Sequence, residues 1–281
     1  MFFQRISNGW ALAKQSFRVL MLDKELLLFP LFSGIACLAV IASFALPLLG
    51  SEWVQTIGDE QGAPGDPLAY LVLFLFYFCN YFVIVFFNSA LIACAVIRFK
   101  GGDPTVADGF RASFSRLPQI VAWALVSATV GLILKIIESR SQRAGRFAAA
   151  LLGSAWGIAT YFVVPVLVVE KLGPGAAIKR SLSVLKNAWG ETIVANFGIG
   201  FIVFLLMIAC MGPALFGVFI GGTVAVTAGI VLSVLGVLLV SLVSSAVNAI
   251  SLGALYLYAS DGAVPAHFDN DFLSHAFVAR R

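Results

Sequence analysis

Long apolar runs alternate with short polar segments along the whole chain. The runs extend roughly over residues 26–49, 68–97, 118–137, 147–169, 192–211 and 223–259. Each is long enough to cross the hydrocarbon core of a bilayer, which takes about 20 helical residues. Because a backbone inside lipid must satisfy its own hydrogen bonds, such runs fold as helices. The pattern therefore predicts an all-α polytopic membrane protein with about six transmembrane helices.

The composition excludes a water-soluble fold. Apolar residues make up 60% of the chain and charged residues only 11%, against about 45 to 50% and about 25% in soluble domains. The four cysteines lie inside apolar runs without a CxxC pair, so we expect neither a disulfide framework nor a zinc site. A cleaved signal carries its apolar core directly after a short basic region. Here a long mixed segment precedes the first run, so we expect the N-terminus to be retained.

Basic residues predict the orientation of the spans. The N-terminal segment is basic, whereas residues 50–67 carry four acidic residues and no Lys or Arg. The positive-inside rule then places the N-terminus in the cytoplasm, and the basic loops after the second and fourth runs agree with this. An even number of crossings also makes the C-terminus cytoplasmic. We expect a multi-pass membrane protein with both termini in the cytoplasm.

One basic loop contradicts this bias. The segment between the third and fourth runs carries Lys135, Arg140, Arg143 and Arg146, yet it must face outward if each run crosses once. Two interpretations remain open. Lys135 and Arg146 reach the headgroups from the helix ends, or Arg140 and Arg143 contact anionic lipid or a partner protein.

Residues 192–260 contain no charged residue and are long enough for three crossings. The stretch GPALFGVFIGG interrupts them with glycines and a proline. We expect two crossings, joined by an irregular outer or re-entrant segment at this stretch.

Three charged segments share one pattern: RISNGWALAKQSFRVL at residues 5–20, TVADGFRASFSRL at 105–117 and AIKRSLSVLKNAWGE at 177–191. Each contains a basic residue, any residue, Ser, Phe or Leu, two more residues, and Leu. Their helical spacing predicts amphipathic helices that lie in the headgroup plane. The apolar stripes comprise Ile6, Trp10, Ala13, Phe17 and Leu20; Phe110, Phe114 and Leu117; and Ile178, Leu182, Leu185 and Trp189.

Each patterned segment precedes a run that starts on the predicted cytoplasmic side. The chain therefore reads as three hairpins, each preceded by a cytoplasmic interfacial helix, within a single membrane domain spanning residues 1–281. The repeats cover about 5–97, 105–169 and 176–259, and a cytoplasmic tail covers 260–281. The alternative is that basic interfacial helices resemble one another because few residue types suit that position.

Polar side chains recur on one face of two predicted spans. Such groups in a membrane face protein or a water-filled cavity rather than lipid. Interhelical packing and the lining of a cavity both fit the pattern. The residues are Tyr77, Tyr81 and Asn88 in the second span, and Ser241, Ser244, Ser245, Asn248 and Ser251 in the last.

The spans hold almost no titratable group, so we expect no enzyme, catalytic residue, cofactor or metal site. The first functional hypothesis is that the protein binds or moves lipid or a small apolar molecule. The second is a structural or accessory subunit with a membrane protein partner or a second copy of itself. Membrane lipids are the expected partners and nucleic acid is not. Headgroup or partner contacts are assigned to Arg140, Arg143, Lys179 and Arg180.

The stretch GSAWGIATYFVVPVLVVEKLGPGAAIKRSLSVLKNAWGE carries a family resemblance through Trp156, Pro165, Glu170, the step from Lys179 to Ser181, and the turn from Asn187 to Gly190. It resembles a family of uncharacterised six-helix bacterial inner-membrane proteins, a domain of unknown function. More distantly, the helix-then-hairpin units are similar to the membrane domain attached to some glycerophosphodiester phosphodiesterases. The resemblance implies the six-helix fold and no activity, because nothing here resembles the phosphodiesterase catalytic domain.

Overall fold

The computed structural model describes residues 2–49, 67–140, 144–187 and 189–262, together with Pro265 and Phe268. Within those ranges the secondary structure is helical, joined by short turns. Six helical stretches are long and apolar enough to cross a membrane, which confirms the all-α class and the six predicted spans. They are Lys24–Pro47, Pro67–Phe99, Leu117–Ser139, Ala144–Val169, Ile199–Ile220 and Thr223–Ser260.

The chain divides into two compact units that alternate along the sequence. The first comprises Met1–Pro30, Cys94–Val106 and Val184–Arg281, and the second comprises Leu31–Ala93 and Ala107–Ser183.

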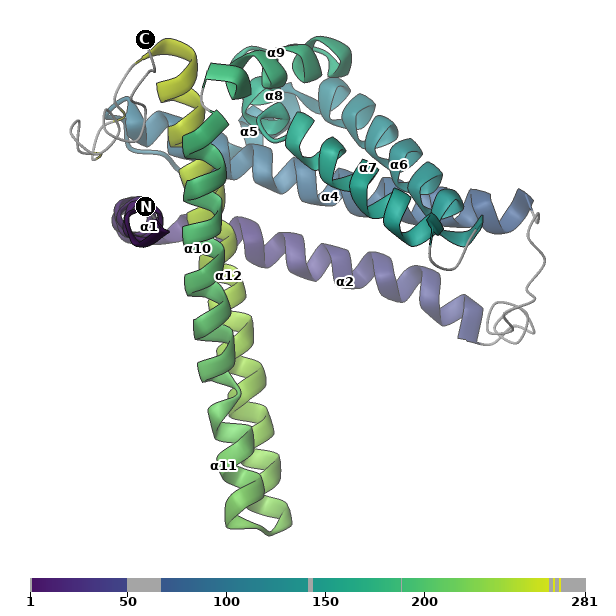
Figure 1. Cartoon of the computed structure of the whole chain (residues 1–281), viewed down its shortest axis with the longest axis vertical. Helices are drawn as coiled ribbons and strands as arrows, with labels where there is room; N and C mark the ends of the chain where they lie inside the picture. The colour runs from purple at the N-terminus through teal and green to yellow at the C-terminus, as the bar shows by residue number, and fades with distance from the viewer. Residues whose placement is uncertain are drawn as a thin grey trace. The chain divides into compact units, whose positions relative to one another are not determined.

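The first unit contains a long antiparallel helix pair. Helix α10 (Trp189–Cys210) continues after Met211 as α11 (Gly212–Ile220), and both pack against α12 (Thr223–Asp261) (Figure 1). A Cβ built on Gly217 would lie 2.4 Å from the Ala225 carbonyl oxygen, and one on Gly229 would lie 2.4 Å from the Pro213 carbonyl oxygen. Glycine therefore lets the two backbones approach closely.

The prediction of an irregular segment at GPALFGVFIGG is wrong, because residues 212–220 of this stretch are helical. Pro213 stands in the first turn of α11, where a proline costs no backbone hydrogen bond. Gly217 serves the contact with α12. The chain reverses only at Gly221 and Gly222, whose φ angles of 78° and 88° suit glycine. Residues 192–260 thus supply two candidate spans.

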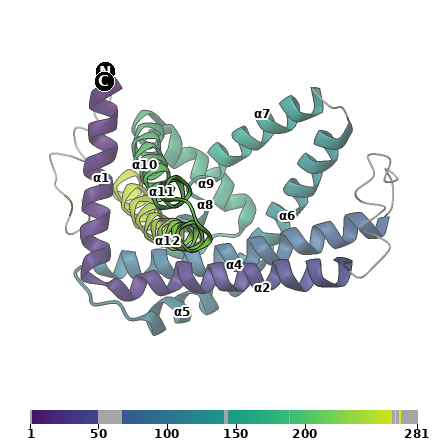
Figure 2. The same ribbon diagram turned by 90° about the horizontal axis from the view of Figure 1, so that it is seen from below.

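Helix α1 (Phe2–Leu22) packs against α10 and α12 and leads into the short helix η1 (Lys24–Leu27). It is seen end-on in Figure 1, where α10 and α12 run along the page, and lengthwise in Figure 2, where they are seen end-on. Helix α1 therefore crosses the pair steeply. Its contact side buries Leu12, Val19 and Leu20 completely.

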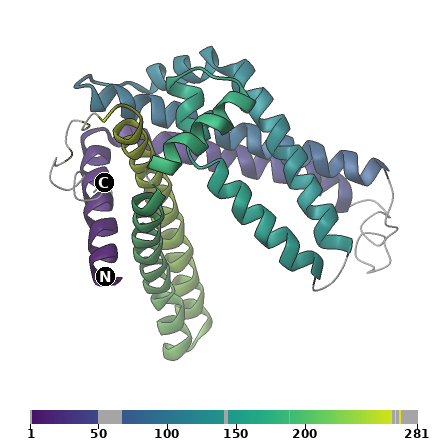
Figure 3. The same ribbon diagram turned by 45° about the horizontal axis from the view of Figure 1, so that its top comes forward.

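The second unit holds most of α2 (Leu28–Leu49), α4 (Pro67–Phe99), α5 (Val106–Ser115) and α9 (Pro174–Asn187), and all of α6 (Leu117–Arg140), α7 (Ala144–Ala159) and α8 (Val163–Val169). Helices α2 and α4 run side by side (Figure 2), with ring centroids 5.6 Å apart for Phe44 and Phe76. Helices α6 and α7 also pair (Figure 3), and the rings of Trp123 and Trp156 stack 5.8 Å apart.

The fourth span is broken between α7 and α8, at residues 160–162. Pro165 explains the break, because a proline ring excludes the carbonyl four residues earlier. The break leaves the Phe162 amide available to a partner outside its own helix. The arrangement of all six spans as three hairpins in a single membrane domain stays a prediction.

Candidate functional site

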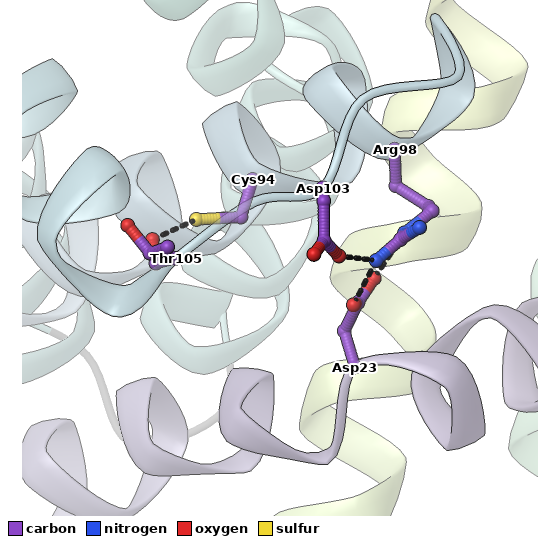
Figure 4. Close-up of polar contacts among 5 residues, drawn as sticks. All are labelled: Asp23, Cys94, Arg98, Asp103 and Thr105. Carbon is purple, nitrogen blue, oxygen red and sulfur yellow. Dashed lines mark hydrogen bonds and ion pairs between the residues drawn. The ribbon is translucent and has the colours of Figure 1, made fainter.

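Three charged residues meet where α1, η1 and α4 end or begin, and we call them the Arg98 cluster (Figure 4). Asp23 lies between α1 and η1, Arg98 in the last turn of α4, and Asp103 in the turn that follows. Arg98 Nε donates to Asp23 Oδ2 over 2.5 Å. Arg98 Nη2 donates to Asp23 Oδ1 and to Asp103 Oδ1.

The turn after α4 brings Asp103 back to Arg98. Gly101 has a φ of 82°, its N–H donates to the Arg98 carbonyl, and the Gly102 N–H donates to the Ile97 carbonyl. This pair of bonds is the Schellman motif, which needs a left-handed residue at Gly101. Cys94 Sγ also donates to the Thr105 carbonyl over 3.5 Å, which holds the end of the turn against α4.

The two aspartates differ in burial. The Asp23 side chain is 7% exposed, that of Arg98 16% and that of Asp103 92%. A buried carboxylate is retained only if it is paired, and Asp23 receives a hydrogen bond from Arg98 on each oxygen. The cluster is therefore a brace between the entry to the first span and the exit of the second. Sequence reasoning missed it, because Asp23 and Arg98 are 75 residues apart and flanking charges are common at span ends.

Three serines occupy the same place in the shared sequence pattern, and we call them the anchor serines: Ser16, Ser113 and Ser181. Each is fully buried. The Ser16 and Ser251 hydroxyl oxygens are 2.7 Å apart. Ser113 Oγ donates to the Phe86 carbonyl over 2.9 Å, and the Phe162 N–H donates to Ser181 Oγ over 3.1 Å. Each serine therefore bonds its amphipathic helix to a span.

The segments that carry the anchor serines are helical, as predicted, and their apolar stripes are only partly buried: Leu20 and Leu185 are buried. Phe17, Phe114 and Leu182 of the stripes are 42%, 61% and 38% exposed. Gln15, a polar residue outside the apolar stripe of α1, is buried. The contact side follows the serine because small polar residues let a helix approach a span closely.

The tyrosines of the second span lie against α6. A Cβ built on Gly131 would lie 3.5 Å from ring carbons of both Tyr77 and Tyr81. Asn88 is half-buried in the same helix. The contacts of the two tyrosines are those of interhelical packing.

The predicted polar residues of the last span separate into two groups. Ser251 is buried against Ser16, and the Ser244 hydroxyl donates to the Val240 carbonyl of its own helix over 2.5 Å. The other three are exposed near the middle of α12. We call this group the α12 polar face: Ser241, Ser245 and Asn248.

The predicted basic contacts also differ from one another. Lys179 is exposed, whereas Arg180 Nε donates to Glu170 Oε1 over 2.7 Å and so holds α9 to the end of α8. Arg140 lies in the last turn of α6, but its side chain is outside the described part of the structure, as is Arg143 altogether.

No curated protein and no solved structure matches the chain. A family of unknown function, DUF6159, matches over residues 68–266, which run from the start of α4 past the end of α12. The match covers more than half of the sequence and includes five of the six apolar spans. This chain has the apolar helices of a multi-pass membrane protein. Because of the match, it belongs to the DUF6159 family, whose function is unknown.

Proposed function

We propose that this protein binds lipid within its membrane spans, at the α12 polar face. The observation that supports this is the exposure of Ser241, Ser245 and Asn248 near the middle of an apolar helix of 39 residues. A hydroxyl or amide without a partner in hydrocarbon costs roughly 2 to 7 kcal/mol. A lipid whose ester and phosphate oxygens reach this face would accept hydrogen bonds from these side chains, and the face would also give a headgroup a polar path for movement along α12.

The proposed setting is a bacterial inner membrane with both termini in the cytoplasm. The basic N-terminal segment and the acidic segment at residues 50–67 support this orientation. The steep crossing of α1 over α10 and α12 also suits a helix that lies along the membrane plane. The function requires no catalytic group, and the distant likeness to the membrane domain of glycerophosphodiester phosphodiesterases stays a prediction.

Native mass spectrometry tests the proposal. The protein is released from lipid nanodiscs, and the retained lipid is counted for the wild type and for the triple variant Ser241→Leu, Ser245→Leu, Asn248→Leu. Thr227→Leu is the control, because Thr227 is exposed on the same helix and its hydroxyl donates to backbone carbonyls of that helix. We expect the triple variant to lose the retained lipid and the control to keep it. Equal retention in a folded triple variant would contradict the proposal.

A second candidate function, that of an accessory subunit, is favoured by the length of the apolar pair. At about 1.5 Å per residue, the 39 residues of α12 extend about 58 Å, whereas the hydrocarbon core is about 30 Å thick. Large apolar side chains stay exposed along α11 up to the turn: Leu215, Phe216, Val218, Phe219 and Ile220. Another membrane protein or a second copy would cover the excess.

Crosslinking in native membranes tests this second candidate. A photoreactive residue in place of Phe219 should capture one discrete protein, whereas the same residue at Leu38, an exposed position in α2, should not. Replacing Arg140 and Arg143 by Gln should release that protein if the outer basic loop contacts it. Capture of lipid alone from Phe219 would exclude the subunit role and leave the lipid-binding proposal intact.

A further inference from the structure

We infer that the three anchor serines orient three equivalent binding sites for anionic phospholipid headgroups, one on each of α1, α5 and α9. The inference rests on the proposed function only in that the chain binds lipid. It names the lipid class, and it concerns residues outside the α12 polar face, so either proposal can fail alone.

The three helices share one burial pattern around the serine. The residue four positions before it is buried in every case, and these residues are Leu12, Gly109 and Ala177. The residue two positions before it is an exposed cation, and the residue one position after it is an exposed large apolar side chain. The cation and apolar pairs are Lys14 with Phe17, Arg111 with Phe114, and Lys179 with Leu182.

The partners of the serines follow a cyclic order. Ser113 of α5 bonds to α4, the span that precedes it, and Ser181 of α9 bonds to Phe162 at the break in the span that precedes it. No span precedes α1 in the described chain, and Ser16 bonds instead to Ser251 in α12, the last span. Helices α5 and α9 are thus fixed to the final span of the preceding repeat and α1 to the final span of the third repeat, which gives the order its cyclic form. A threefold repeat predicts this shared role of the three serines.

Helix geometry turns the cation away from the serine. At about 100° per residue, a side chain two positions before the serine points about 160° from it, and a side chain one position after points about 100° from it. With the serine held against a span, the cation and the apolar side chain share the outward face. This pairing suits the edge of a bilayer, where the apolar side chain enters the acyl region and the cation reaches a phosphate.

The charge of the outward face selects the lipid. Each site offers one cation, and the residue is an exposed Lys or Arg in all three. Among the described residues, these three cations form one ion pair, the exposed one between Arg111 and Asp108, at 3.3 Å. An exposed pair of this kind is weak, so Arg111 can exchange it for a phosphate. An anionic phospholipid gains about fivefold in affinity from each basic residue near the surface.

Binding of phosphatidylglycerol in nanodiscs of phosphatidylcholine tests the inference. Native mass spectrometry gives the number and affinity of retained phosphatidylglycerol molecules for Lys14→Gln, Arg111→Gln, Lys179→Gln and the triple variant. The control is the triple variant Lys24→Gln, Lys100→Gln, Lys171→Gln, which removes the same charge from exposed positions outside the pattern. We expect each single change to weaken one site about fivefold and the triple variant to abolish the preference for phosphatidylglycerol over phosphatidylcholine.

The control should keep that preference. If the control loses the preference to the same extent, the net charge of the protein explains the effect and the inference is overturned. A loss of phosphatidylglycerol binding on only one of the three helices would also overturn it. Phosphatidylglycerol binding that persists when the α12 variant has lost its lipid separates this inference from the proposed function.

The serines are tested by Ser113→Val and Ser181→Val, with Ser115→Val and Ser183→Val as controls two positions away on the exposed side. We expect Ser113→Val and Ser181→Val to lose phosphatidylglycerol affinity although the cations are intact. The serine bond fixes how each helix is turned about its own axis, and without it the cation no longer keeps its outward orientation. Unchanged affinity in the folded first pair would overturn the positioning role.

A crosslink tests the cyclic order even if these variants fail to fold. In a background without the native cysteines and with a protease site at residues 141–143, Ser16→Cys with Ser251→Cys should join the two fragments by a disulfide. Ser16→Cys with Ser241→Cys should not, because residue 241 lies about 15 Å further along α12. Joining in both, or in neither, would overturn the order.

Discussion

Removing the buried aspartate of the Arg98 cluster should cost far more stability than removing the exposed one. Asp23→Ala leaves the Arg98 guanidinium, 16% exposed, without the carboxylate that accepts from both Nε and Nη2. Breaking a buried pair on one side costs about 3 to 5 kcal/mol, and the partial exposure of Arg98 places this case near about 3 kcal/mol. Asp103→Ala removes a side chain that is 92% exposed, so we expect less than about 1 kcal/mol.

The comparison is matched, because both changes remove one acidic partner of the same arginine. Thermal unfolding in detergent or nanodiscs, followed by tryptophan fluorescence, measures the difference. A loss of about 3 kcal/mol should lower the midpoint by about 6 to 12 °C. High salt should reduce the small effect at Asp103 and leave the effect at Asp23 unchanged, since buried pairs are screened less. Equal shifts for the two variants would refute the assignment of Asp23 as the structural partner.

Two further changes test the packing of the helices. Gly229→Ala places a Cβ 2.4 Å from the Pro213 carbonyl oxygen and must push α11 away from α12, so the thermal unfolding midpoint should fall. In the control Gly200→Ala the new Cβ meets no atom within 4 Å, so the midpoint should not fall. Equal midpoints for the two variants would contradict the close contact. Ser113→Ala removes the hydroxyl that donates to the Phe86 carbonyl and should cost about 1 kcal/mol in chemical unfolding, while exposed Ser115→Ala should be near neutral; a neutral Ser113→Ala would argue against the anchoring bond.

The six spans could be predicted because apolar length alone determines whether a helix can cross a bilayer. The helix at residues 106–115 was also predictable, since its spacing repeats that of the other two basic segments. The break before Pro165 also has a local cause, because proline lacks an amide hydrogen and its ring is bulky. These features depend on residues near one another in sequence.

Features that depend on distant partners could not be predicted in the same way. The pattern singled out the anchor serines as a shared position, but their burial depends on spans as much as 235 residues away. Asp23 and Arg98 read as ordinary flanking charges until α1 and α4 are brought together. Glycine and proline suggested an irregular segment at residues 212–222, yet most of it is helical, because Gly217 serves a close backbone contact and Pro213 begins a helix.

The central claim is that the spans hold lipid at the α12 polar face, and an electron cryomicroscopy map of the protein in lipid nanodiscs tests it most directly. We predict lipid density whose polar end lies against Ser241, Ser245 and Asn248. Side chains of this chain, or of a second copy, packed over those three residues with no lipid between them would contradict the claim.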